Sequence, residues 1–254
     1  MTDLTILKIG GSVITYKDEA KRLKRDVIDQ VTKEVTDTSC GRLILVHGAG
    51  SFGHPQAAKH FSTERNLLKD AFAVFDINKT VIELNTVFIS SLIEYGAPAL
   101  PLHPMNFTLL ENGRIHSMMI EHIEEMLKQG FIPVLHGDVV LDRTRSYSIL
   151  SGDQIVSYLA RKLQAKRVGL GADVDGVMDG AGKVIEHITP QNVDKIEFRE
   201  GAADDVTGAM RGKVTELLEL ADYGISSYIF NGKKRGNIKR WLEGEKIVST
   251  VISE

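Results

Sequence analysis

Hydrophobic and polar residues alternate along the chain with two different periods. Short apolar runs predict buried strands at residues 4–10, 42–48, 97–103 and 131–137. Segments with apolar residues three or four positions apart lie between them and predict helices at 25–35, from about Asn66 to Tyr95, and at 117–130, where Gly130 forms a C-cap. This rhythm is typical of a mainly parallel sheet with helices on both faces.

The second half of the chain continues the pattern. Residues 138–150 predict a hairpin with a polar tip, and a helix over 151–164 opens with Ser151 and Asp153. Strands are expected near 167–178, 226–232 and 246–253, with helices at 209–224 and 237–244. The polar stretch 183–205 predicts irregular surface structure. The best candidate boundary lies near residue 151, which gives lobes of 1–150 and 151–254 on one continuous sheet.

The composition narrows the class of protein. The 254 residues are 43% hydrophobic and 26% charged, which is ordinary for a globular protein, and no apolar run reaches membrane-spanning length. Because 31 Lys+Arg face 34 Asp+Glu, the basic footprint of a nucleic-acid-binding protein is missing. The single cysteine, Cys40, excludes an intrachain disulfide and fits a reducing compartment. We therefore expect a cytoplasmic protein without nucleic-acid or membrane partners.

The first chemical signal is the segment KIGGSVIT, in which a strand runs into Gly10, Gly11 and Ser12. Glycines let the backbone approach an anion closely, and the N–H groups of such a turn can point at phosphate oxygens. A plain tight turn is the structural alternative. Lys8 and Lys17 on either side favour the phosphate site, because two ammonium groups can offset the charge on a phosphoryl group in transfer.

The second signal, VHGAGSFGH at residues 46–54, again follows a buried strand. Ligands of open α/β sheets bind at the carboxyl ends of strands, so two glycine-rich loops there are expected to converge. His54 is a candidate donor to an anionic substrate, with a solvated loop histidine as the alternative. His47 is interpreted as a structural hydrogen-bonding residue inside the turn.

A third group lies in the C-terminal half. Asp153 begins a predicted helix, where it is either a capping carboxylate or the group that holds the lysines in place. Asp173 and Asp175 are candidates for an Asx turn or for a site near a nucleotide. Lys213, one turn inside the helix after the TGAM segment, predicts another helix N-terminus facing phosphate.

Taken in order, the segments KIGGS, HGAGSFGH, GDVVLD, SGDQ, DVDGV and TGAMRGK resemble the amino acid kinase superfamily, and within it the archaeal-type isopentenyl phosphate kinases. The terminal histidine of HGAGSFGH is shared with these enzymes and the related fosfomycin kinases. The resemblance implies an α/β fold, a three-layer αβα sandwich with a mainly parallel central sheet. It also implies that the acceptor binds in the N-terminal half and ATP in the C-terminal half.

The resemblance also implies roles for individual residues. Lys8, Lys17 and Lys213 would handle phosphate, with Lys17 as the main stabiliser of the transition state, and Asp153 would orient them. His54 would hold the acceptor phosphate with the backbone of Ala49, Gly53 and Gly152. The residues near ATP, besides Lys8 and Lys213, would be Gly10, Gly11, Ser12, Gly50, Asp173, Asp175, Gly176 and Gly208. One departure is Ala209, which replaces a glycine usual in this family and can also occur in fosfomycin kinases.

The implied reaction is ATP-dependent phosphorylation of isopentenyl phosphate for isoprenoid biosynthesis by a homodimeric enzyme. A phosphate acceptor is already anionic at neutral pH, so no general base is required. Mg²⁺ would arrive with ATP, because no cluster of His, Cys or carboxylates suggests a metal held by the protein. Two alternatives stay open: a kinase of the same fold for fosfomycin or an amino acid, and a non-catalytic module that binds a nucleotide or oxyanion.

The acceptor's apolar tail requires an apolar slot. In the long predicted helix Phe72, Phe75 and Asn78 lie close to one face, and Val81 extends the row. We expect Phe72 and Phe75 to close the end of the slot. Packing in the core is the alternative for apolar residues at this spacing.

Overall fold

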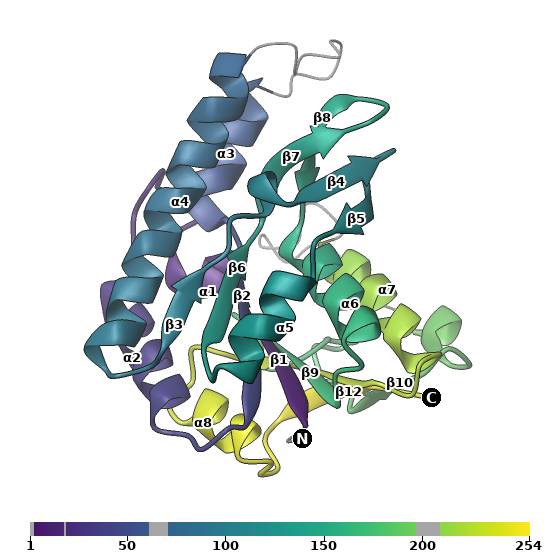
Figure 1. Ribbon diagram of the computed structural model, residues 1–254. Helices are drawn as coiled ribbons and strands as arrows, with labels where there is room; N and C mark the ends of the chain where they lie inside the picture. The colour runs from purple at the N-terminus through teal and green to yellow at the C-terminus, as the bar shows by residue number, and fades with distance from the viewer. Residues whose placement is uncertain (1–2, 18, 61–70, 197–208) are drawn as a thin grey trace.

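An eight-stranded sheet forms the centre of the computed structural model, which describes residues 3–17, 19–60, 71–196 and 209–254. The strand order is β10-β12-β11-β9-β1-β2-β6-β3 (Figure 1). All neighbouring pairs are parallel except β11 and β12. The strands are β1 (Leu4–Ile9), β2 (Arg42–His47), β3 (Ala99–Pro101), β6 (Ile132–His136), β9 (Arg167–Ala172), β10 (His187–Ile188), β11 (Ser226–Asn231) and β12 (Ser249–Ile252). The predicted mainly parallel sheet is confirmed.

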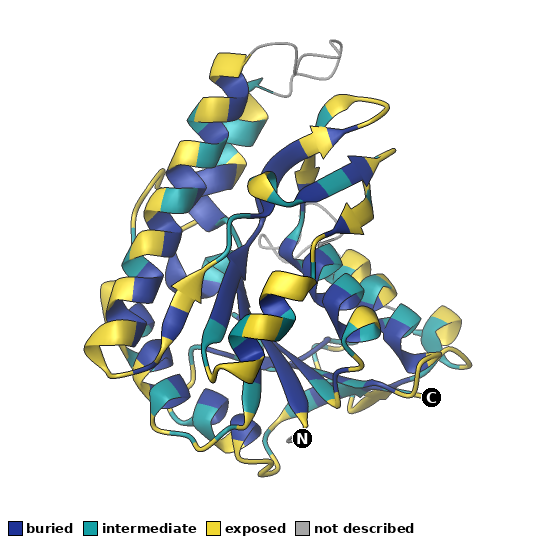
Figure 2. Ribbon diagram, viewed as in Figure 1, coloured by how far each residue is buried: buried dark blue, intermediate teal, exposed yellow. Residues whose placement is uncertain are grey.

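Helices cover both faces of this sheet. One layer contains α5 (Glu121–Lys128), α6 (Gly152–Lys162) and α7 (Ala209–Ala221), and the other contains α2 (Arg25–Thr36), α4 (Ala71–Glu94) and α8 (Asn237–Leu242) (Figure 1). Alternate side chains of β1 enter the two cores, Ile6 on the α6 side and Leu7 on the α4 side. The buried strands between exposed helix faces are visible in Figure 2. The three-layer αβα sandwich is therefore confirmed.

A smaller sheet extends beyond the main one, in the order β5-β4-β7-β8. Its strands are β4 (Thr108–Glu111), β5 (Arg114–Met118), β7 (Asp138–Asp142) and β8 (Ser146–Leu150). The hairpin predicted at 138–150 is confirmed, whereas the β4–β5 hairpin was not predicted. Its signal is the pair Asn112 and Gly113, whose positive φ angles of 53° and 79° suit a tight hairpin turn.

Three boundaries differ from the sequence-based expectations. The helix predicted from residue 117 begins at Glu121, because Ser117 and Met118 pair with β4. The glycine-rich segments predicted as loops enter two helices, the short α1 (Gly11–Ile14) and α3 (Gly50–His60). The irregular segment predicted at 183–205 contains β10 and the 3₁₀ turn Val193–Lys195, and its last residues lie outside the described ones. A further 3₁₀ turn spans Pro104–Asn106.

Hydropathy along the helices gives a separate result. Among the described residues, none of the helices is both long enough and apolar enough to cross a membrane.

Candidate active site

A cavity of about 810 Å³ opens at the carboxyl ends of the central strands. Parallel strands bring these ends to one edge of the sheet, so loops far apart in the sequence meet there. The cavity is lined by residues of both glycine-rich loops and by charged residues from strands, helices and the loops between them. The predicted site residues that line it are Lys8, Gly10, Gly11, Ser12, Lys17, Ala49, Gly50, Gly53, His54, Gly152, Asp153, Asp173, Gly176 and Lys213.

The two glycine-rich loops touch each other backbone to backbone. A Cβ atom on Gly11 would lie 2.4 Å from the nitrogen of Gly50, and one on Gly48 would lie 2.6 Å from the nitrogen of Gly11. Thr15 joins the loops, because its hydroxyl donates to the Gly11 carbonyl at 2.8 Å and accepts from the Ser51 N–H at 3.0 Å. Thr15 was not predicted as a site residue from the sequence. The available signal is that Thr15 ends the same KIGGSVIT segment that contains the first glycine-rich loop.

Lys8, which is buried, and Asp153, which is partly buried, form an ion pair on the cavity wall. The Lys8 ammonium lies 2.6 Å from the Asp153 carboxylate, and Lys8 is 5% exposed. The helix cap is Ser151, whose hydroxyl accepts the N–H of Gln154, so Asp153 is available to bind Lys8. Burial lowers the pKa of Lys8, and Asp153 opposes this effect. Burial raises the pKa of Asp153, but the charges of Lys8 and Lys213 outweigh it, so this carboxylate has a pKa below its usual range.

Lys213 and His54 extend the positively charged region. Lys213 on α7 is close enough for its charge to act on Lys8, Asp153 and His54. His54 lies in α3 at the cavity surface. His54 is exposed at the cavity, but the surrounding protein removes part of its solvent and so lowers its pKa. The charges of Lys8 and Lys213 lower the pKa of His54 further. The lowered pKa favours the neutral imidazole, which has one N–H to donate.

Lys17 binds a different carboxylate. Its ammonium lies 3.1 Å from Asp173, which follows β9. Burial raises the pKa of Asp173, and the hydrogen bond and charge of Lys17 lower it by more. Asp175 is not among the residues that line the cavity, in contrast to the expectation that it lies near the nucleotide. Its carboxylate instead accepts from Asn231 at 3.0 Å and from Lys234 at 2.7 Å.

The cavity is apolar on either side of the charged groups. Ile77 and Val81 of α4 and Ile149 of β8 form one apolar group in its lining, and Val174, Met178 and Met210, from the loop after β9 and from α7, form another. Phe72 and Phe75 do not line it, because their side chains are 83% and 63% exposed. This corrects the expectation for the two phenylalanines: they lie on the exposed face of α4, whereas Ile77 and Val81 lie on its buried face.

Gly208, the remaining candidate residue, lies outside the described part of the chain. Lining residues that the sequence analysis did not assign include Gly137 and Asp138, which follow β6. Their signal was a second His-Gly pair after a buried strand, at 136–137, which repeats the pair at 47–48.

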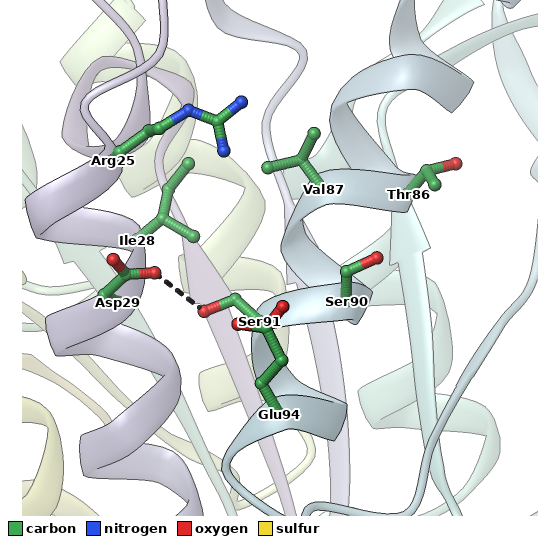
Figure 3. A pocket seen from close by; sticks show the side chains of 8 residues that line it. All are labelled: Arg25, Ile28, Asp29, Thr86, Val87, Ser90, Ser91 and Glu94. Atoms are coloured by element: carbon green, nitrogen blue, oxygen red, sulfur yellow. Dashed lines mark hydrogen bonds between the residues drawn. The ribbon is translucent and has the colours of Figure 1, made fainter.

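A second hollow of about 250 Å³ lies between α2 and α4. Its lining is Arg25, Ile28, Asp29, Thr86, Val87, Ser90, Ser91 and Glu94 (Figure 3). The Ser91 hydroxyl donates to Asp29 at 3.1 Å across it. Its lining contains no lysine and no glycine-rich loop, so its chemistry does not match transfer of a phosphoryl group.

Comparison with known proteins leads to the same kinase family that the lysines and glycine-rich loops of the cavity indicate. The profile of the amino acid kinase family matches residues 3–231. The chain belongs to the amino acid kinase family. Two relatives in this family are the isopentenyl phosphate kinases of Methanothermobacter thermautotrophicus and Methanocaldococcus jannaschii, which are 38% and 34% identical. The alignments cover 98% and 95% of this chain, and 99% and 96% of the relatives.

A solved structure within the amino acid kinase family gives the same result. An isopentenyl phosphate kinase known from X-ray structures is 36% identical and superposes with a TM-score of 0.86 over 98% of this chain and all of its own. The resemblance found in the sequence, to the amino acid kinase superfamily and within it to isopentenyl phosphate kinases, is confirmed.

Proposed function

We propose that this protein transfers the γ-phosphoryl group of ATP to isopentenyl phosphate and forms isopentenyl diphosphate. The observation that carries the proposal is the continuity of one cavity, which joins a cluster of lysines to an apolar end formed by Ile77, Val81 and Ile149. A short branched hydrocarbon fits such an end, whereas an amino acid needs a buried partner for its ammonium group. The isopentenyl phosphate kinases 34–38% identical over nearly the whole chain support the same substrate.

The chain's own residues supply positioning and charge stabilisation. The Lys8 ammonium, held by Asp153, and Lys213 face the charge that spreads over the transferring group, and Lys17 is proposed to act mainly in the transition state. His54 donates its N–H to the acceptor phosphate. The acceptor oxygen attacks as an anion, so no side chain has to remove a proton.

Mg²⁺ is expected to enter bound to ATP. Among the described residues no group of three or more His, Cys, Asp or Glu is placed to hold a metal ion. Asp153 and Asp173 at the cavity are each bound to a lysine. When bound, Mg·ATP brings charge neutralisation at the β- and γ-phosphates.

Four expectations from the sequence remain proposals. Residues 1–150 would bind the acceptor and residues 151–254 ATP, on the shared central sheet. The protein would act as a cytoplasmic homodimer in the mevalonate route to isoprenoids. Sedimentation of the purified protein measures the oligomeric state directly.

ADP release tests the proposed function. The assay is run with isopentenyl phosphate, fosfomycin, N-acetylglutamate and no acceptor, at equal ATP and Mg²⁺. Only isopentenyl phosphate is expected to stimulate ADP release, with the diphosphate as product. Stimulation by fosfomycin or N-acetylglutamate instead would identify another kinase of this fold. ADP release unaffected by every acceptor would support a non-catalytic module.

The role of His54 is tested by substitution. His54→Ala is expected to lower kcat/KM for the acceptor by about tenfold or more, because a hydrogen bond to a charged phosphate contributes about 1.5–3 kcal/mol. His54→Gln keeps a donor and should lose less. The exposed His122→Ala on α5 is the matched control. Unchanged acceptor kinetics in His54→Ala would show that the imidazole is only solvated.

The apolar end of the cavity should determine tail length. Ile77→Ala and Ile149→Ala are expected to shift the ratio of kcat/KM toward a ten-carbon prenyl phosphate by about tenfold, since each buried methylene contributes about 0.8 kcal/mol. Phe75→Ala is the control, because this ring is exposed and off the cavity and should leave the ratio unchanged. A shift in Phe75→Ala and none in the isoleucine variants would place the tail on the outer face of α4.

A further inference from the structure

Two His-Gly pairs stand side by side at the carboxyl edge of the sheet. His47 ends β2 and His136 ends β6, and the two residues are partners in the parallel register of these strands. Their rings stack with centroids 5.6 Å apart, and neither is exposed. The glycines that follow, Gly48 and Gly137, both line the cavity.

The hydrogen bonds assign one tautomer to His47. Its Nδ1 lies 3.1 Å from the carbonyl oxygen of Gly48. A carbonyl oxygen only accepts, so Nδ1 carries the proton. Nε2 then has a lone pair, which accepts from the side-chain amide of Asn85 at 3.0 Å. Asn85 lies in α4 and is also fully buried.

His136 repeats this arrangement one strand away. Its Nδ1 lies 3.0 Å from the carbonyl oxygen of Gly137, and its Nε2 lies 2.9 Å from His103. The Gly137 N–H in turn donates to the His47 carbonyl at 3.1 Å, which joins the two loops. Burial lowers the pKa of His47 to about 3 and that of His136 to about 4, so both rings are neutral at physiological pH and keep one donor and one acceptor each.

The direction of the Gly48 carbonyl determines the direction of the Ala49 N–H group. The peptide between Gly48 and Ala49 is trans and planar, so its N–H points away from its C=O. Because the carbonyl turns back to the buried His47 ring, the Ala49 N–H turns the other way. In the described part of the chain no acceptor binds this N–H, and Ala49 lines the cavity beside His54.

We propose that His47, held in one tautomer by Asn85, is a positioning residue that aims the Ala49 N–H at the phosphate of the acceptor. This inference rests on the proposed function, because the phosphate of isopentenyl phosphate is the anion assigned to this loop. His47 does not touch the acceptor and acts through the Gly48–Ala49 peptide. The proposal adds a role in acceptor binding to the structural hydrogen bonding that was expected of His47 from the sequence.

Binding constants of variants test the positioning role. His47→Leu keeps the volume and removes the donor, whereas His47→Asn places an amide N–H near the position of Nδ1. In calorimetry with isopentenyl phosphate, His47→Leu is expected to raise Kd by about tenfold, and His47→Asn should recover most of the loss. The Kd for ATP should change by less than the acceptor Kd in both. The exposed His122→Leu serves as control.

Equal increases in the two Kd values, or the same loss in His47→Asn as in His47→Leu, would make His47 a packing residue and overturn the proposal. If His47→Leu does not fold, NMR of the ¹⁵N-histidine-labelled wild type decides separately. His47 should show a protonated Nδ1 and an unprotonated Nε2, and the reverse tautomer would contradict the proposal. No binding of isopentenyl phosphate by the wild type, with the expected tautomer present, would refute the proposed function and with it the assigned ligand.

Discussion

Lys8→Met is expected to lower kcat by about 10²–10³-fold, the range seen when one preorganised donor to a developing charge is removed. Lys8 is buried on the cavity wall with its ammonium 2.6 Å from Asp153, so it requires little reorganisation when charge develops nearby. Methionine keeps the length and apolar stem of the side chain and removes only the charge and its donors. Steady-state kinetics with saturating ATP and acceptor measures the change.

Stability has to be separated from catalysis in this variant. Removing Lys8 leaves the Asp153 carboxylate, whose side chain is 16% exposed, without its partner. Breaking a fully buried pair costs about 3–5 kcal/mol, and a smaller loss is expected here because the cavity and Lys213 still stabilise the charge. Lys8→Met combined with Asp153→Asn removes both charges and should restore much of the melting temperature without restoring kcat. Lys33→Met is the matched control, because Lys33 on α2 forms an exposed ion pair with Asp37. Recovery of kcat in the double variant would show that Lys8 acts only by neutralising Asp153.

Gly11→Ala is expected to abolish activity and to lower the melting temperature. The added Cβ would lie 2.4 Å from the nitrogen and 2.5 Å from the Cα of Gly50. Both are backbone atoms, which cannot move aside as the end of a flexible side chain could. Overpacking of this kind typically costs about 1–3 kcal/mol, and here relief requires that the two phosphate-facing loops separate. Differential scanning calorimetry and ADP release on the same preparation measure both effects.

Gly212→Ala is the matched control for stability. A Cβ there meets nothing within 4 Å, and Gly212 lies inside α7, where alanine is favoured over glycine by up to about 1 kcal/mol. Its melting temperature should therefore hold or rise. An unchanged melting temperature and kcat in Gly11→Ala would mean that the two loops are not in contact.

The sequence was most informative where the hydrophobic pattern predicted which residues lie at the carboxyl ends of parallel strands. Lys8 and both glycine-rich loops end parallel strands, so their meeting at one cavity could be expected. The partner of Asp153 could not be decided from the sequence, since a cap is a local contact whereas Lys8 lies 145 residues away. Only the structure shows that Ser151 caps the helix and that Asp153 reaches Lys8.

Helix α4 shows the limit of periodicity. Spacing identifies which residues share a face of a helix, but it does not say which of two apolar faces turns inward. The sequence analysis placed Phe72, Phe75 and Val81 in one row, whereas in the structure only Val81 of these three lines the cavity, together with Ile77. Packing on the strands and on α3 directs Ile77 and Val81 into the cavity and leaves the rings exposed.

The central place of β1 has a consequence for biosynthesis. β1 pairs with β2 on one edge and with β9 on the other, and β9 begins at Arg167. At about 5–20 residues per second, translation leaves the second edge of this apolar strand unpaired for about ten seconds or more. An open strand edge is a template for pairing with other chains. Nascent or stalled chains that end before residue 172 are therefore the species in which aggregation competes most directly with folding.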